Sequence, residues 1–239
     1  MHPLDNPVWD ALIGSQHEFA EVGGLAARFI PDVSRFGAFP ELPGPDHWAA
    51  MAHLVGPGGS VILLGDTGTL PDGWAVDYDG TGVQMTGEEV DARVGDDARQ
   101  RTDIDIDILP LGASDAADMV ALVALTRPGP FEARTWELGG YVGVRSEGRL
   151  VAMAGQRLRP TGCCEISAVA THPEYRRQGL AEILVRVVAG RIAARGEVPI
   201  LHTAADNADA IRLYERMGFV HRRLVHFAGI RAPAIPPTD

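Results

Sequence analysis

The stretch HPEYRRQGLAEILVRVV, from His172 to Val188, constrains this chain more than any other part of its sequence. Its first half is polar and basic, and after Gly179 it becomes a helical pattern with one apolar stripe, formed by Leu180, Leu184, Val187, Val188 and Ile192. A glycine lets the backbone approach a ligand closely, and the first N–H groups of a helix have no partner inside it. The pattern therefore predicts a site for a strongly anionic group such as a pyrophosphate. The alternative is an ordinary solvated loop before a surface helix.

The elements predicted around this turn follow an unusual order. A strand that places Ile104, Ile106 and Ile108 on one face precedes a helix for which Ser114 is the expected N-cap. Three antiparallel strands then lead into the basic turn and its helix, which are followed by a short strand, a second helix and a final strand. The expected ranges are 102–111, 114–125, 140–146, 149–157, 163–171, 180–196, 199–203, 207–218 and 219–230.

Residues 1–101 are less regular. We expect helices within 6–22 and 45–55, a buried strand over 60–66, a hairpin over 72–87 and a polar linker over 87–101. The sequence shows no internal repeat of 20–50 residues. We therefore predict an N-terminal lobe of residues 1–101, a C-terminal domain of residues 102–231 and a frayed tail of residues 232–239.

Charge is divided unevenly along the 239 residues, whose net charge is −11. Residues 1–110 hold 19 acids and 5 arginines, whereas residues 111–239 hold 13 acids and 16 arginines. So acidic a chain is a poor partner for nucleic acid, but its second half suits an anionic ligand. The acidic first half could face a cationic ligand, although acidic surfaces usually serve solubility alone.

The composition is typical of a globular protein. Apolar residues make up 46%, which permits a packed core, and no apolar run approaches the roughly 20 residues of a membrane span. The adjacent Cys163 and Cys164 offer neither a disulfide framework nor metal-ligand spacing, so we expect no metal. Cys163 could line a cleft, although a structural role fits as well. We expect a cytoplasmic, reduced protein with no membrane partner, and the absence of lysine suggests a GC-rich bacterial genome.

Two motifs together resemble a known family. AVATHPEYRRQGLA contains the pattern R-x-x-G-x-A from Arg176 to Ala181, and NADAIRLYERMGF follows about 30 residues later, at residues 207–219. They resemble the acetyl-CoA-binding signatures of the GNAT N-acetyltransferase superfamily. The resemblance implies an α/β (α+β) fold with a mixed, mostly antiparallel central sheet flanked by helices. The two-lobed layout also resembles glycine N-acyltransferase-like proteins, whose smaller N-terminal lobe is a degenerate relative of the C-terminal one.

The resemblance implies roles for particular residues. The catalytic candidates are Tyr214, as the acid that protonates the leaving thiolate, and Glu165, as the base. The implied cofactor-binding residues, which hold the pyrophosphate and the pantetheine arm, are Val169, Ala170, Thr171, Arg176, Arg177, Gln178, Gly179, Leu180, Ala181, Asn207 and Tyr214. Three of these residues have an alternative role. Tyr214 could be a core aromatic, Asn207 a plain N-cap and Glu165 a solvent-facing strand carboxylate. His202 could reach the substrate, but a structural role is expected.

We therefore expect an acetyl-CoA-dependent N-acetyltransferase, a monomer or homodimer, that moves an acetyl group directly to a primary amine of a small molecule. Two alternatives remain. One is a catalytically silent CoA-binding sensor or interaction module, and the other is an acyltransferase that uses a longer acyl-CoA.

Overall fold

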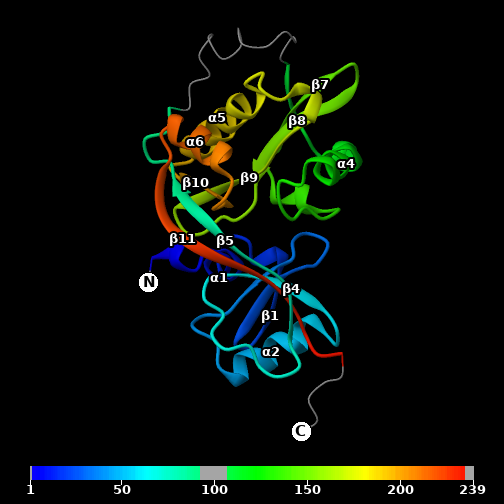
Figure 1. Ribbon diagram of the computed structural model, residues 1–239, viewed down its shortest axis with the longest axis vertical. Coiled ribbons are helices and arrows are strands. Elements are labelled where there is room, and N and C mark those ends of the chain that lie inside the picture. Colours follow the sequence, from blue (N-terminus) through cyan, green and yellow to red (C-terminus); the bar gives the residue numbers. More distant parts are fainter. Residues whose placement is uncertain (1, 92–106, 235–239) are drawn as a thin grey trace.

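The computed structural model describes residues 2–91 and 107–234, and in that part of the chain eleven strands form one sheet (Figure 1). The spatial order is β1-β2-β3-β4-β11-β5-β10-β9-β8-β7-β6. The strands are β1 Ala20–Gly23, β2 Ala26–Phe29, β3 Phe36–Ala38, β4 Ser60–Leu64, β5 Ala75–Thr86, β6 Ile108–Pro110, β7 Val142–Ser146, β8 Arg149–Gln156, β9 Cys163–Thr171, β10 Val198–Ala204 and β11 Val220–Arg231.

Most neighbouring strands run antiparallel. Among the described strands, only β3 with β4 and β9 with β10 pair in parallel. The helices that flank the sheet are α1 Pro7–Ile13, α2 Pro45–Val55, α4 Ala116–Thr126, α5 Leu180–Ala193 and α6 Ala208–Arg216. This arrangement confirms the predicted fold class.

Two helices pack against opposite faces of the C-terminal strands. Val185 and Val188 of α5 belong to a core cluster that includes Val151 of β8. Met119 of α4 belongs to a second cluster that includes Met153, two residues further along the same strand. Because neighbouring side chains of a strand alternate between faces, residues 151 and 153 would share a face in a regular strand. The register of β8 against β7 shifts between Leu150 and Ala152, so Val151 is an extra residue of β8, and this irregularity can place Val151 and Met153 in different clusters.

The N-terminal strands show the same arrangement on a smaller scale. Val8 of α1 packs in a cluster with Ile62 of β4. Met51 of α2 packs in a cluster with Val61 and Leu63, the neighbours of Ile62. Strand β4 is therefore covered on both faces, and its apolar sequence SVILL agrees with that burial.

The predicted hairpin over 72–87 is wrong, because β5 is one continuous strand that pairs with β11 along its whole length. A glycine in each strand makes room for an aromatic ring of the other. A Cβ on Gly82 would lie 2.4 Å from the ring of Phe227, and a Cβ on Gly229 would lie 2.2 Å from the ring of Tyr78. Each strand thus has a glycine where an aromatic ring of the other strand lies across it. The long β5–β11 ribbon joins the two ends of the molecule (Figure 1).

Several other expectations can be compared with the structure. The strand over 163–171, the helix after Gly179 and the helix over 45–55 are confirmed. The helix within 6–22 is shorter than expected, because it ends at Ile13.

The expected cap at Ser114 is wrong. The residue before α4 is Asp115, whose carboxylate accepts a hydrogen bond from the Gly112 N–H, and Ser114 lies in the preceding 3₁₀ turn. Ile104, Ile106 and residues 92–101 of the expected linker lie outside the described residues. The domain division after residue 101 stays a prediction. Strand β5, which precedes residue 101, lies in the sheet between β10 and β11, which follow it in the sequence. No described helix is long and apolar enough to cross a membrane.

Candidate functional site

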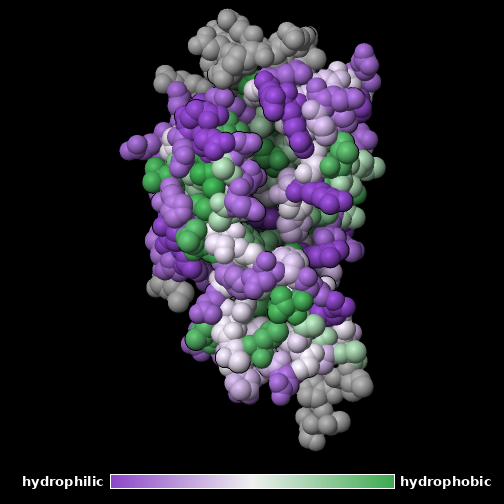
Figure 2. All heavy atoms as spheres, in the orientation of Figure 1, coloured by the Kyte–Doolittle hydropathy of each residue, from purple (hydrophilic) through white to green (hydrophobic). Residues whose placement is uncertain are grey.

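A cavity of about 1160 Å³ opens where two parallel strands separate. Strands β9 and β10 pair only from Cys163 to Ile166 on β9, so the rest of β9 has no neighbour on that side. The register of β9 against β8 also shifts, and Ala168 has a positive φ of 52°, as expected for a bulge that bends the strand. Residues 166–171 line the cavity, and Figure 2 shows a hollow near the middle of the molecule.

The basic turn forms one end of this cavity. Arg177 and Gly179 both lie in the left-handed region, with φ of 64° and 80°, and α5 begins at the next residue, Leu180. The N-cap residue, Gly179, has no side chain that could cap the helix, and among the described residues the first N–H groups of α5 are available to a ligand. The amides and the helix dipole favour an anion, to which Arg176 and Arg177 add positive charge.

Most of the predicted cofactor-binding residues meet at this end. Ten of them line the cavity: Val169, Ala170, Thr171, Arg176, Arg177, Gly179, Leu180, Ala181, Asn207 and Tyr214. Gln178 does not line the cavity. Its Oε1 atom and the Oγ1 atom of Thr171 are both buried, and neither has a hydrogen-bond partner among the described residues. Asn207 is also the N-cap of α6, because its Oδ1 accepts a 3.2 Å hydrogen bond from the Ala210 N–H.

Tyr214 reaches the cavity from α6. The residue is 8% exposed, and its ring meets Phe219 edge-on with centroids 5.9 Å apart. Burial raises the pKa of Tyr214 to about 12, so its hydroxyl keeps its proton at neutral pH. A protonated hydroxyl beside β9 can donate to an atom that gains negative charge.

Glu165 lies behind the cavity wall rather than in it. The residue is 0% exposed, and its two oxygens accept hydrogen bonds from Arg157 Nε at 2.9 Å and Nη2 at 2.6 Å. His202 Nδ1 lies 2.8 Å from Oε1. Burial alone would raise the pKa of Glu165, but Arg157 and then His202 hold it well below its usual range. A solvent-facing carboxylate is therefore the wrong description, and direct contact of Glu165 with an amine in the cavity has no geometric support.

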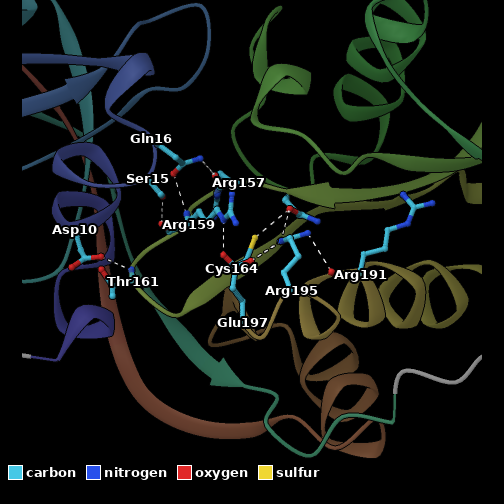
Figure 3. Close-up of polar contacts among 11 residues, drawn as sticks. Asp10, Ser15, Gln16, Arg157, Arg159, Thr161, Cys164, Arg191, Arg195 and Glu197 are labelled. Atoms are coloured by element: carbon cyan, nitrogen blue, oxygen red, sulfur yellow. Dashed lines mark hydrogen bonds and ion pairs between the residues drawn. The ribbon is translucent and has the colours of Figure 1, made fainter.

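Residues of the N-terminal part hold Arg157 in place. Gln16 Nε2 donates a 2.6 Å hydrogen bond to the carbonyl of Arg157, and Gln16 Oε1 accepts a 3.0 Å hydrogen bond from the Arg159 N–H. The Thr161 N–H donates to Asp10 Oδ1 at 2.5 Å. Figure 3 shows these contacts between the α1 region and the connection from β8 to β9.

The far end of the cavity is built from residues that sequence reasoning missed. They come from five strands and the connection after β8, and they are Phe36, Ile62, Tyr78, Thr81, Arg157, His202 and Phe227. No local motif marks them, because only the pairing of β4 and β5 with β11 brings them together. Of these only His202 had been considered, and its side chain is 1% exposed and lies between Glu165 and Gln84.

One earlier candidate, Cys163, lies elsewhere. Cys163 packs with Leu4 and Ile200 in a small cluster and does not line the cavity. Within residues 2–91 and 107–234, no group of three or more His, Cys, Asp or Glu side chains could hold a metal ion.

Comparison with known proteins agrees with this geometry. Residues 141–227 match the family described as FR47-like protein. A crystal structure from Novosphingobium aromaticivorans, described as an acetyltransferase from the GNAT family, is 39% identical, covers 96% of this chain and 98% of its own, and superposes with a TM-score of 0.83. The chain belongs to the GNAT family. A GCN5-related N-acetyltransferase from Kribbella flavida shares the fold at 18% identity, with a TM-score of 0.60 over 94% of this chain and 95% of its own.

Curated relatives within the GNAT family match a smaller part. The N-alpha-acetyltransferase RimI of Mycobacterium tuberculosis is 35% identical over 99 residues, which are 38% of this chain and 61% of the relative. The [ribosomal protein bS18]-alanine N-acetyltransferase of Escherichia coli is 38% identical over 72 residues, which are 30% of this chain and 45% of the relative. The chain thus spans about half the length of these relatives. The resemblance to glycine N-acyltransferase-like proteins stays a prediction.

Proposed function

We propose that this GNAT-family protein is an acetyl-CoA-dependent N-acetyltransferase that moves an acetyl group directly to the primary amine of a small molecule. The observation that carries the proposal is the opening between β9 and β10, which ends at an uncapped helix N-terminus with two arginines. Family membership supports the acetyltransferase chemistry. The small-molecule acceptor and the residue roles are our own assignments.

The cavity fits the donor at its basic end. The unpaired edge of β9 after Ile166 offers backbone groups to an extended amide chain, in the way that a sheet accepts an added strand. The N–H groups of residues 177–181 would hold the pyrophosphate. The oxygens of Thr171 and Gln178 have no partner among the described residues, which is the pattern that a site leaves when the ligand completes its hydrogen bonds.

The chain's own groups account for the transfer. When bound, acetyl-CoA supplies the acetyl group as a thioester, and the reaction forms a C–N bond while the C–S bond breaks. The Tyr214 hydroxyl holds the proton that the departing sulfur needs. The backbone of β9 orients the carbonyl, so that the amine attacks from the far end of the cavity.

The amine must also lose a proton. Glu165 is the base that the resemblance implied, but it is fully buried, so a proton could reach it only through a group such as His202. The Nε2 atom of His202 already has a polar partner, because the Gln84 amide nitrogen lies 3.0 Å from it. A water molecule in the cavity is the simpler carrier for this proton.

A small acceptor is supported by the residues that form the walls at the far end of the cavity. Phe36, Ile62, Tyr78 and Thr81 line its far end, and all four precede residue 141, where the match to the FR47-like family begins. The matched region therefore lacks these walls, and the protein substrates named for the curated relatives do not carry over to this chain directly.

Calorimetric titration with acetyl-CoA tests the proposal. The native protein is expected to bind with a Kd in the micromolar range, whereas Gly179→Glu is expected to lose detectable binding. Glutamate at this position combines negative charge with a side chain in left-handed backbone. Gly148→Glu provides a matched control, because Gly148 also has a positive φ (80°) but lies in the turn between β7 and β8, outside the cavity lining. No binding by the native protein would overturn the proposal.

A further inference from the structure

The far end of the cavity differs in charge from the basic end. Two acids occur in the described lining, Glu182 on α5 and Asp209 on α6, and both belong to the helices of the basic end. The walls of the far end contribute no carboxylate in the described part of the chain, and Arg157 places a guanidinium there. A polyamine or another polycation would therefore find no free carboxylate in the described walls of the far end, because Glu165 behind them is already paired with Arg157.

The Arg157 guanidinium has N–H donors that its hydrogen bonds to Glu165 do not use. Its side chain is 8% exposed, and it donates to Glu165 through Nε and Nη2. A guanidinium has five N–H donors, and Nη1 has no hydrogen-bond partner among the described residues. Since Glu165 and the backbone contacts to Gln16 fix the side chain, the remaining N–H groups have a fixed position at the cavity wall.

Aromatic and branched apolar side chains surround this guanidinium. Its carbon lies 4.7 Å from the ring centroid of Phe36, which is 1% exposed. Ile62, Phe227 and the partly exposed Tyr78 complete the wall. Tyr78 and Phe227, which keep exposed surface, gain by contact with an apolar group, whereas the free N–H groups need an oxygen acceptor.

We propose that the acceptor is a primary amine that carries an aromatic or branched apolar group and, next to the amine, a carbonyl or carboxylate oxygen that accepts hydrogen bonds from Arg157. This inference rests on the proposed function and specifies the substrate class of the same site. The apolar group contacts Tyr78 and Phe227, the oxygen binds Arg157, and the amine points toward β9 and the thioester carbon.

Four amines test the inference on the native protein through release of free thiol from acetyl-CoA. Phenylalanine and phenylalanine amide carry both features, phenethylamine lacks the oxygen, and spermidine is a polycation. We expect kcat/KM for at least one of the first two to exceed that for phenethylamine by about tenfold or more, with spermidine lowest. If phenethylamine or spermidine equals or exceeds both, or if none of the four is acetylated, the inference is overturned. Acetyl-CoA titration of the same sample decides separately whether the proposed function stands.

A pair of variants tests Arg157 itself. Arg157→Lys keeps the charge beside Glu165 but removes the fork, so the ratio of kcat/KM for the preferred oxygen-bearing amine to that for phenethylamine should fall about tenfold. Arg159→Lys is the control, because Arg159 pairs with Glu197 outside the cavity lining, and it should leave the ratio unchanged. An unchanged ratio in a folded Arg157→Lys variant would contradict the inference. If that variant does not fold, the comparison of amines on the native protein remains decisive.

Discussion

The two ends of the cavity are built in different ways. The basic end comes from one continuous stretch, in which β9 leads through the turn at Arg176–Gly179 into α5, and its charged groups are exposed. The far end is assembled from strands that are distant in the sequence, and both its Arg157 and the Glu165 paired with it behind the wall are buried. A local site can change without changing the fold, whereas a buried site made from distant strands is part of the core. Substitutions at the two ends should therefore affect different measurable quantities.

The largest effect is expected at the far end. Glu165→Gln should lower the free energy of unfolding by about 3–5 kcal/mol, because Arg157 would remain buried and charged without its carboxylate. Urea denaturation of both proteins measures the difference. Glu174→Gln is the control, since its ion pair with Arg149 is exposed and should leave the unfolding midpoint almost unchanged. Equal stability of Glu165→Gln and the native protein, together with a 100-fold lower kcat, would instead support Glu165 as the base.

The difference in stability between the native protein and Glu165→Gln should depend on pH. Because the folded-state pKa of Glu165 lies below its unfolded value of about 4.3, its carboxylate stabilises the native protein fully above that value. The stabilisation is lost progressively as the pH falls from about 4.3 toward the folded pKa. The stability gap between native protein and Glu165→Gln should therefore narrow as the pH falls below about 4.3. A gap that widens on acidification would exclude this account.

These two ends also differ in how far the sequence could predict them. The basic turn, β9, α5 and α6 rest on local signals, namely a glycine, a capping asparagine and a helical apolar stripe, and the structure places them together. The far end has no such signal. Gly80 and Gly82 suggested a turn, yet they lie in a continuous strand, where Gly82 makes room for Phe227 from residues far along the chain. Glu165 likewise could not be recognised as buried until Arg157 and His202 were brought beside it by folding.

A smaller effect is expected at Tyr214. Tyr214→Phe removes only the hydroxyl, so kcat should fall about 100-fold with little change in KM for acetyl-CoA or in the unfolding midpoint. Because burial raises the pKa of Tyr214 to about 12, the native rate should show no loss of this acid between pH 7 and 10.

Tyr175→Phe is the matched control for Tyr214. Tyr175 also lines the cavity, but its hydroxyl lies 3.2 Å from Ser146 Oγ, so its removal should change kcat less than twofold. If Tyr214→Phe keeps native kcat, the hydroxyl is not the acid, and Tyr214 is the core aromatic of the alternative interpretation.

The smallest effects separate the two arginines of the turn. Arg177 has a φ of 64°, so Arg177→Gly should relieve left-handed strain and raise the free energy of unfolding by about 0.5–1 kcal/mol. Its neighbour Arg176 is extended, with φ −67° and ψ 159°, so Arg176→Gly should lower the stability by a similar amount, about 0.5–1 kcal/mol. Each variant removes one positive charge beside the helix N-terminus, so both should bind acetyl-CoA roughly threefold to tenfold more weakly. Thermal unfolding and calorimetry on the two variants would thus give opposite changes in stability and the same change in affinity. If Arg177→Gly were more stable and bound acetyl-CoA as tightly as the native protein, the strained arginine would have no part in the anion site, and the helix N-terminus with Arg176 would have to account for donor binding alone.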